Sequence, residues 1–455
     1  MTEAATQKSA AENRLRDVTS ALESGTLARV RLMLNDLRPA EIAHLLESLR
    51  PSQRQAVWRL ISPEINGEVL LHVNDEVRAS LIEEMDTEAL VAATEGLDMD
   101  DLADLMEDLP EAVISEVLRS MDEQNRRRLE AVLSYPEDSA GGLMNTDTIT
   151  VRADVTLDVV LRYLRLRGEL PDLTDSLYVV NRYDKFLGVL PLSTLLTSDP
   201  ARTVASVMDL EVEPITADTP ATEVAKIFEQ RDLISAPVVD DDNRLLGRIT
   251  IDDVVDVIID EADHSLMSMA GLDEEEDMFA PVLTSSRRRA VWLGINLITA
   301  FVAAWFIGMF QETLEQVVAL AVLMPVAASM GGVAGTQTLT LVIRALALGQ
   351  LETRNARWLL MKEVAVGGIN GLLWAAVVAI IAVAWFQDLR IGAFIAAALV
   401  IVLVAAAVAG FLIPVLLRRW GVDPALAGTV ILTTVTDVVG YTSFLGLASL
   451  FIGSS

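Results

Sequence analysis

The feature that most constrains this chain is a long apolar run that begins at Pro424 and contains a single charged residue, Asp437. A run of this length is typical of a membrane-spanning helix, which needs about 20 apolar residues. A carboxylate near the middle of such a helix costs about 3 kcal/mol to insert, so we expect it to face a polar cavity, a partner or an ion. Hydroxyl oxygens and space near the carboxylate come from Thr433, Thr434, Thr436, Thr442 and Gly440. The alternative is an Asp437 that is protonated, or paired with a neighbouring helix, and only fixes helix packing.

Charge is distributed unevenly along the chain. Of 65 acidic and 35 basic residues, seven acids and ten bases fall within residues 287–455, which leaves 58 acids and 25 bases in residues 1–286. An acidic soluble half therefore precedes an apolar half. Such a surface repels nucleic acid and attracts cations, although the charge could serve solubility alone. Cysteine is absent from the sequence, which excludes disulfides and thiolate metal sites.

Residues 1–134 contain short helical phrases with apolar residues at helical spacing. Prolines stand near the phrase starts, where the missing N–H is tolerated; these are Pro39, Pro51, Pro63 and Pro110. Helices this short cannot bury a face alone, so neighbours are expected to stack into an all-α superhelical domain. The stretch MTEAATQKSAAENRLRD lacks the apolar core of a signal peptide, and we expect the acidic half to lie in the cytosol.

The phrase YPEDSAGGLM, residues 135–144, interrupts the helices and marks a boundary. Beyond it, the order strand, helix, strand, turn, strand, helix occurs twice, in residues 143–204 and 205–265 of an α/β domain that spans 135–265. The first copy is expected to contain a strand at Thr148–Val151, a helix at Leu157–Arg167 and a strand pair about a turn at Tyr183–Lys185. The second copy places a helix at Ala221–Gln230.

This internal repeat resembles a tandem pair of CBS modules, and its second copy carries the typical phrase GRITIDDV at residues 247–254. Modules of this kind often hold adenosine nucleotides such as ATP, with a Thr and an Asp on the ribose. Thr250 and Asp253 match that pair, whereas Thr194 replaces the Asp in the first copy. The resemblance therefore implies at most one nucleotide site. The alternative is a regulatory or dimerising module without nucleotide.

Residues 287–455 contain five apolar segments, each long enough to span a bilayer: Ala290–Phe310, Val317–Ile343, Val364–Phe386, Ile391–Leu417 and Pro424–Ile452. The bases between the segments predict the orientation. One side holds Arg287, Arg288, Arg289, Arg344, Arg354, Arg357, Lys362, Arg418 and Arg419, against Arg390 on the other. The positive-inside rule then places the acidic half in the cytosol and the C-terminus outside.

The second apolar segment contains LMPVAASMGGVAGTQT, with Pro325 and a set of glycines. Proline removes a helical hydrogen bond, and freed carbonyls at membrane depth are tolerated where they line a watery cavity. Polar groups at the same level are Thr336, Gln337 and Thr338. The alternative is close helix packing, which glycine also serves. Oxygen ligands without Cys or His suit a hard cation, and Mg²⁺ gives up water reluctantly, so a site for the hydrated ion is favoured.

Taken together, the order of helical array, CBS pair, connector and five spans resembles the MgtE family of Mg²⁺ channels over essentially the whole chain. The phrases that carry the resemblance are YPEDSAGGLM, GG-x-x-G-x-Q at Gly331–Gln337, and TDVVG around Asp437. The resemblance implies a homodimer with its pore between subunits and Asp437 as the main Mg²⁺ site. The backbone near Gly331, Gly332 and Gly335, with Thr336, is expected to help. Val333 stands where the family commonly has Asn.

The resemblance also implies a gate, because cytosolic Mg²⁺ closes the family's channels by bridging acids of the helical array, the CBS pair and a connecting plug helix. The matching residues are Asp100, Asp101, Asp104, Asp253, Asp256, Asp260, Glu261 and Asp263. The plug helix falls around Asp260–Ala270, within a connector over residues 260–286 that also holds the acidic run Asp273–Asp277. His264 stands where an acid is expected. For any single acid, a solvated surface position is the alternative.

The sequence thus predicts a homodimeric Mg²⁺ channel of a bacterial inner membrane, driven by the electrochemical gradient and closed by cytosolic Mg²⁺. No covalent chemistry is expected, since the sequence has neither a GxxxxGK[ST] loop nor a recognisable hydrolytic triad. One rival is a transporter of Co²⁺, Ni²⁺ or Mn²⁺, with or without proton coupling through Asp437. Another is a nucleotide-sensing membrane scaffold that carries no ion.

Overall fold

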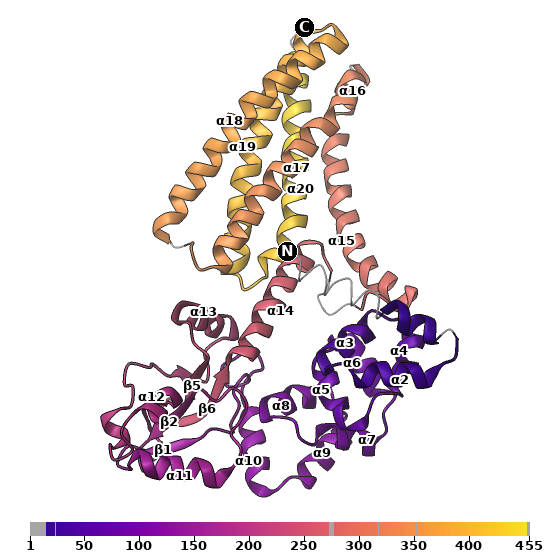
Figure 1. Ribbon diagram of the computed structural model, residues 1–455. Helices are drawn as coiled ribbons and strands as arrows, with labels where there is room; N and C mark the ends of the chain where they lie inside the picture. The colour runs from indigo at the N-terminus through magenta and orange to yellow at the C-terminus, as the bar shows by residue number, and fades with distance from the viewer. Residues whose placement is uncertain (1–14, 23, 273–276, 317, 352, 453–455) are drawn as a thin grey trace. The chain divides into compact units, whose positions relative to one another are not determined.

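The computed structural model describes residues 15–22, 24–272, 277–316, 318–351 and 353–452. The chain divides into two compact units, which Figure 1 labels by element. The first unit comprises the described residues within 1–263 and 275–281, and the second those within 264–274 and 282–455. Most of the predicted acidic run Asp273–Asp277 lies outside the described residues, and Asp277 alone is placed.

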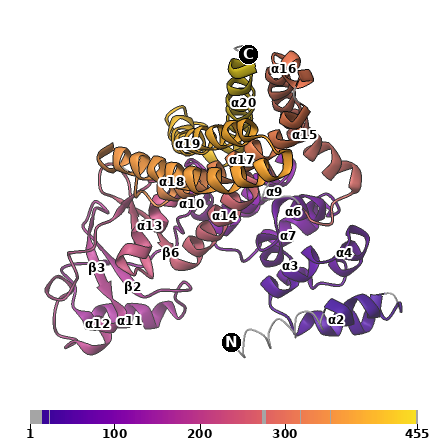
Figure 2. The same cartoon turned by 90° about the horizontal axis from the view of Figure 1, so that it is seen from above.

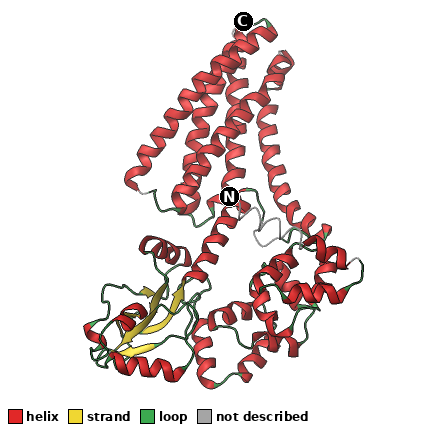
Figure 3. Ribbon diagram, in the orientation of Figure 1, coloured by secondary structure: helices red, strands yellow, loops and turns green. Residues whose placement is uncertain are grey.

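The first unit begins with an array of short helices, as the sequence predicts (Figure 3). Pro39 and Pro51 occupy the first turns of their helices, and Asp86 caps α7 by accepting the Ala89 N–H at 2.8 Å. The elements are α2 (Leu27–Asn35), α3 (Pro39–Glu47), α4 (Pro51–Trp58), η1 (Pro63–Ile65), α5 (Asn66–Leu71), α6 (Asp75–Ile82), α7 (Thr87–Thr94), α8 (Met99–Glu107), α9 (Glu111–Ser120) and α10 (Glu123–Val132).

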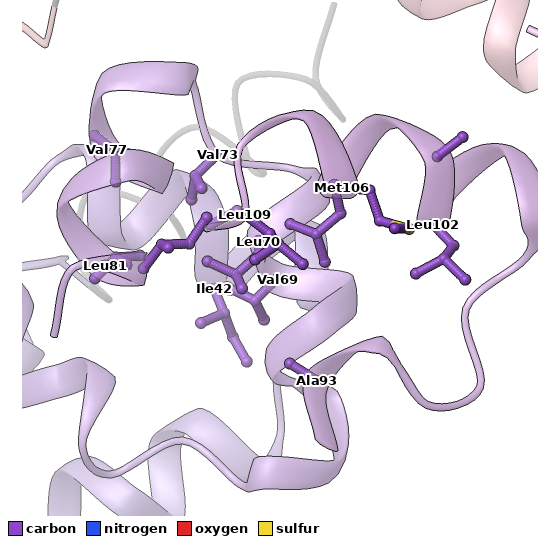
Figure 4. Packing of buried hydrophobic residues seen from close by; sticks show 14 of the residues in the cluster. Ile42, Val69, Leu70, Val73, Val77, Leu81, Ala93, Leu102, Met106 and Leu109 are labelled. Carbon is purple, nitrogen blue, oxygen red and sulfur yellow. The ribbon is translucent and has the colours of Figure 1, made fainter. Parts of the chain in front are cut away.

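Each short helix buries one apolar side in a shared core. Figure 4 shows Ile42, Leu70 and Met106, from three different helices, packed in one cluster. Burial of one such side chain contributes about 1.5–3 kcal/mol, so the array is stable only because neighbours share the core. The same cluster continues into the second CBS copy through Val224 and Phe228. This shared core fixes α8 relative to the second CBS copy.

The α/β region contains two three-stranded sheets with the same topology, which confirms the predicted repeat. In each sheet the central strand pairs in parallel with the first strand and antiparallel with the third. The strands are β1 (Thr150–Arg152), β2 (Ser176–Val180), β3 (Phe186–Pro191), β4 (Ile215–Thr216), β5 (Ser235–Val239) and β6 (Leu245–Thr250). The helices are α11 (Leu157–Arg167), α12 (Leu192–Thr197), η2 (Val204–Ser206), α13 (Ala221–Arg231) and α14 (Ile251–Met269).

The two copies meet through their hairpin turns, which contact each other symmetrically. The Phe186 N–H donates to the Asn243 carbonyl at 2.9 Å, and the Leu245 N–H donates to the Asp184 carbonyl at 3.0 Å. Asp184 and Asn243 both adopt positive φ, a conformation that Asp and Asn tolerate better than most residues. The pairing joins the two sheets, while Ile249 of β6 and Val254 of α14 belong to the same core cluster as the helical array.

Among its described residues, the second unit has five helices that are long and apolar enough to cross a membrane. They are α15 (Val282–Gly308), α17 (Val318–Ala347), α18 (Thr353–Phe386), α19 (Leu389–Arg419) and α20 (Pro424–Ile452), with the short α16 (Gln311–Gln316) after the first. Helix α19 is the most buried and packs against α17, α18 and α20 (Figure 2). Helix α15 packs along α20, and most of its surface is exposed.

One expectation about the second span is not met. Helix α17 continues through Pro325 and the glycines without interruption, so the predicted opening of its backbone is not observed. The glycines instead allow close helix approach: a Cβ on Gly331 would lie 2.3 Å from Val402 of α19, and one on Gly335 would lie 2.9 Å from Leu432 of α20. Close packing, the alternative interpretation, describes these two positions.

Candidate metal sites

Asp437 lies on α20, half-buried within the single chain. No hydrogen bond or ion pair joins it to another side chain in the described part of the chain. Thr433 and Thr434 precede it by one helical turn and Tyr441 follows by one turn, so these residues share its side of the helix. The hydroxyls of Thr433 and Thr434 donate to the Thr429 and Val430 carbonyls at 2.9 and 2.8 Å. Their oxygen lone pairs therefore remain available as acceptors.

The other two predicted hydroxyls do not face the same side. Thr436 is buried against Gly331 of α17, where a glycine Cβ would lie 3.5 Å from the Thr436 Cβ. The Thr442 hydroxyl is buried and has no hydrogen-bond partner among the described residues. The reason is helical geometry. With 3.6 residues per turn, Thr436, one residue before Asp437, and Thr442, five residues after it, lie on other sides of the helix. The expectation that four threonines surround Asp437 is wrong for these two.

The glycine-rich stretch of α17 presents two different sides. Gly331 and Gly335 are buried against α19 and α20, whereas a Cβ on Gly332 would meet nothing within 4 Å. The Thr336 hydroxyl donates to the Gly332 carbonyl at 2.9 Å, and Val333 is 58% exposed. The predicted pore residues are thus split, with Gly332 and Thr336 near the open side and Gly331 and Gly335 on the packed side.

A second acid within the helix bundle was counted in the sequence but given no role. Glu363 of α18 is 5% exposed, and its carboxylate accepts a hydrogen bond from the Thr338 hydroxyl of α17 at 3.1 Å. Lys362 lies 3.3 Å from its other oxygen. The available signal was the charge pair at the start of an apolar run, but sequence alone could not show that Thr338 is its partner.

In the first unit, acids of α8 and α14 lie close enough to affect one another's protonation. Burial, with Asp253 as the next cause, raises the pKa of Asp100 to about 8. Burial and then Asp252 raise the pKa of Asp253 to about 7. Burial and then Asp98 raise the pKa of Asp101 to about 6. Burial also raises the pKa of Asp256. We call the following six residues the acidic cluster: Asp98, Asp100, Asp101, Asp252, Asp253 and Asp256.

Backbone and side-chain contacts position the acidic cluster. The Asn145 amide donates to Asp100 at 3.2 Å, and the Asn145 backbone pairs with Arg248 of β6. Asp253 accepts hydrogen bonds from the Thr250 N–H at 3.2 Å and from the Thr250 hydroxyl at 3.1 Å. The predicted nucleotide pair is therefore bonded within itself, and its Asp253 faces Asp100. Both bonds from Thr250 end on Oδ2 of Asp253.

The predicted regulatory acids are brought together only in part. Asp100, Asp101, Asp253 and Asp256 share the acidic cluster, and Asp104 raises the pKa of Asp101 from the same helix. Asp260, Glu261 and Asp263 lie farther along α14. Three further residues of this region were not predicted from the sequence: Asp98, Asp252 and His72, the last of which lowers the pKa of Asp256. Among the described residues, no three acidic or histidine side chains converge closely enough to hold an ion as they stand.

His264 of α14 lies in the second unit and has a specific neighbour. Its Nε2 is 3.5 Å from Oδ2 of Asp423, the residue that precedes α20. Asp423 also caps α20 by accepting the Ala425 and Leu426 N–H groups at 2.9 and 3.0 Å. Where the sequence analysis expected an acid, the structure therefore has a histidine next to an acid.

Comparison with known proteins agrees with this architecture. Family models match the MgtE intracellular N domain over residues 37–138, the CBS domain over 140–200 and 204–260, and the divalent cation transporter MgtE over 324–447. The magnesium transporter MgtE of Thermus thermophilus is 34% identical over 334 residues, which are 73% of this chain and 74% of that protein. The magnesium transporter MgtE of Bacillus subtilis is 30% identical over 337 residues, 74% of this chain and 75% of that protein.

A crystal structure of the cytosolic domain of the Mg²⁺ channel MgtE in complex with ATP is 32% identical, and it covers 53% of this chain and 99% of that chain with a TM-score of 0.49. The similar proteins are named as transporters, in agreement with the expectation that no covalent reaction is catalysed. This chain belongs to the MgtE family of divalent cation transporters.

Proposed function

We propose that this chain conducts hydrated Mg²⁺ across the membrane with Asp437 as the principal ion site. The observation that carries the proposal is a carboxylate in a spanning helix that no other side chain neutralises within the described residues. Such acids usually mark an ion path, because a charge in hydrocarbon needs compensation. One carboxylate and a few hydroxyls suit the water shell of Mg²⁺ better than the bare ion. The relatives' printed names support magnesium as the cargo.

The active assembly is proposed to be a homodimer with its pore on the two-fold axis. Asp437 is half-buried in one chain, and Gly332 and Thr336 lie near the open side of α17. A second copy across a two-fold axis would double the negative charge offered to a divalent ion. Gly331 and Gly335 would contribute indirectly, by holding α17 against its neighbours, and Val333 would sit at the open side in place of the family's usual Asn.

The acidic cluster is proposed to sense cytosolic Mg²⁺. Its carboxylates repel each other when ionised, and a divalent ion between them converts this repulsion into attraction. An ion that binds one conformation better than another shifts the population towards it. High cytosolic Mg²⁺ would therefore favour the compact arrangement of α8 and α14 and close the path. Asp104, Asp260, Glu261 and Asp263 are proposed to extend this sensing surface.

The proposed location is a bacterial inner membrane, with the first unit in the cytosol and the C-terminus outside. The bases at the ends of α15, α17, α18 and α19 support this orientation through the positive-inside rule. Import would then follow the electrochemical gradient. An adenosine nucleotide at the CBS pair is proposed as a modulator, with Thr250 and Asp253 at its ribose.

The test is Mg²⁺ uptake into proteoliposomes by the wild type, Asp437→Asn, and Asp388→Asn as a matched control at the start of α19. We expect uptake to fall at least tenfold in Asp437→Asn and to stay within about twofold in the control, because Asp388 caps α19 and Asn is an equally good helix cap. Undiminished uptake by Asp437→Asn would remove this residue from the conduction site. Uptake of Mn²⁺, Co²⁺ or Ni²⁺ in preference to Mg²⁺ would favour the rival cargo.

A further inference from the structure

Glu363 and Thr338 form a buried polar contact between two membrane-spanning helices. Glu363 on α18 and Thr338 on α17 are each 5% exposed, and 3.1 Å separates the hydroxyl from the carboxylate oxygen. The second carboxylate oxygen lies 3.3 Å from the Lys362 ammonium, which is half-exposed. Both oxygens therefore have donors, which is the condition for keeping a carboxylate in a buried position.

The contact lies where three helices approach closely. A Cβ on Gly410 of α19 would be 2.7 Å from the Gly335 carbonyl and 3.0 Å from the Thr338 Cβ, both on α17. A Cβ on Gly367, one turn beyond Glu363, would be 2.8 Å from the Leu403 carbonyl of α19. Backbone contacts thus hold α17 and α18 against α19, and the bond from Thr338 to Glu363 joins α17 directly to α18.

Thr338 lies one turn of α17 beyond Gly335 and two turns beyond Gly331, the glycines that contact the Asp437 helix. Gly335 contacts Leu432 and Gly331 contacts Thr436, the residue before Asp437. A shift or rotation of α17 would carry these contacts with it, because a helix moves as a rigid element over such short distances. Whatever fixes Thr338 therefore also fixes the surface on which the Asp437 turn of α20 packs.

From these contacts we infer that Glu363 is a positioning residue for the ion path, acting through Thr338 to hold α17 in register against α20. The inference rests on the proposed conduction through Asp437. Glu363 itself need not touch the ion, because its charge is already balanced by Lys362 and its oxygens are occupied. Its effect is the placement of the α17 turn that packs beside Asp437.

The experiment compares the concentration dependence of Mg²⁺ uptake in proteoliposomes for four variants and one double variant. Glu363→Ala and Thr338→Val each remove the bond, whereas Glu363→Gln keeps an acceptor oxygen and Thr338→Ser keeps the hydroxyl. We expect the first two to raise the KM for Mg²⁺ about tenfold, the scale of one hydrogen bond to a charged group. We expect the two conservative variants to stay within about threefold of the wild type, and Glu363→Ala with Thr338→Val to be no worse than either single change.

Three results would overturn the inference. An unchanged KM in the folded fraction of Glu363→Ala and Thr338→Val, with only a lower Tm, would make the bond merely structural. An equal rise in KM for Glu363→Gln and Glu363→Ala, with no change in KM for Thr338→Val, would mean that the charge of Glu363 acts on the ion directly. Additive losses in the double variant would mean that the two side chains act separately. If Glu363→Ala does not fold, the Thr338 pair decides alone. A wild type without Mg²⁺ flux would instead refute the proposed function, which is a distinguishable result.

Discussion

Arg54 of α4 and Asp277, which lies just before the first membrane helix, form an ion pair of 2.8 Å whose side chains are 3% and 5% exposed. Arg54 also donates to the carbonyls of Leu46 and Leu49, at 3.0 and 3.2 Å. The Asp277 N–H donates to Glu76 at 2.8 Å. The segment that leads into α15 is thereby anchored in the core of the helical array.

Removing one partner of this pair should be strongly destabilising, because it leaves a buried charge without compensation. We expect Asp277→Ala to lower the free energy of unfolding of the first unit by about 3–5 kcal/mol. The matched control is Glu123→Ala, which removes an exposed ion pair with Arg127 and should cost less than about 1 kcal/mol. Denaturant unfolding of the full chain would measure both. Equal effects of the two changes would show that the buried pair has no special importance.

The acidic cluster should make the first unit more stable at low pH when Mg²⁺ is absent. The pKa values of Asp100 and Asp253, about 8 and about 7, lie above their ordinary value of 3.8, so the folded state binds protons that the unfolded state releases. Stability therefore falls as pH rises from about 4 towards about 8. The charged and titratable groups that influence these carboxyls and their neighbours are Asp98, Asp101, Asp104, Asp147, Asp172, Asp252, Asp256, His72 and Arg248.

Saturating Mg²⁺ should reduce this loss, since a divalent ion replaces protons between the carboxylates. Thermal unfolding of the full chain near pH 5.5 and near pH 8.5, with Mg²⁺ and with EDTA, provides the measurement. We expect the difference between the two pH values to shrink in Asp253→Asn, which cannot ionise at that position. A first unit that becomes more stable as pH rises in EDTA would contradict the raised pKa values.

The pair of His264 and Asp423 predicts a gain of metal sensitivity on substitution. The Asp423 carboxylate lies 3.5 Å from the His264 imidazole. A carboxylate in place of that imidazole would be close enough to Asp423 for both to bind the water shell of one Mg²⁺ ion. We expect His264→Asp to let cytosolic Mg²⁺ suppress uptake at a concentration several-fold lower than in the wild type. His264→Asn, which adds no charge, is the control. No difference between the two variants would show that this pair does not take part in metal sensing.

The glycines of the helix bundle should differ sharply in their tolerance of alanine. A Cβ on Gly410 would lie 2.7 Å from the Gly335 carbonyl, a backbone atom that cannot rotate away. We expect Gly410→Ala to destabilise the second unit by about 1–3 kcal/mol. Gly332→Ala is the matched control, because a Cβ there meets nothing within 4 Å, and alanine favours a helix by up to about 1 kcal/mol. Thermal unfolding in detergent would rank them. A reversed ranking would contradict the close approach of α17 and α19.

Local patterns predicted the elements of this fold well. Helix α11 spans Leu157–Arg167 as expected, both hairpins are present, and each predicted apolar segment corresponds to one long helix. Helix α15 begins at Val282 rather than near Ala290, because hydropathy detects contact with the bilayer and not the polar turns that continue the helix. These features depend on residues close in sequence, which is why they can be predicted without a structure.

Contacts between distant residues could not be predicted in the same way. Asp277 looked like the end of a solvated acidic run, and Glu363 like one acid at the edge of a span. Their partners, Arg54 and Thr338, are far away in sequence and are identified only by packing. The glycines of α17 allowed two interpretations, an opened backbone or close helix approach. At Gly331 and Gly335 the close contacts with α19 and α20 support the second.

In the proposed function, Asp437 conducts Mg²⁺ and the acidic cluster closes the path when cytosolic Mg²⁺ rises. The most direct test is Mg²⁺ flux through oriented proteoliposomes, with Mg²⁺ titrated on the cytosolic face, for the wild type, Asp253→Asn and Asp437→Asn. We expect flux that cytosolic Mg²⁺ suppresses in the wild type, flux that persists to higher Mg²⁺ in Asp253→Asn, and flux at least tenfold lower in Asp437→Asn. Wild-type flux that ignores cytosolic Mg²⁺, or full flux in Asp437→Asn, would contradict it.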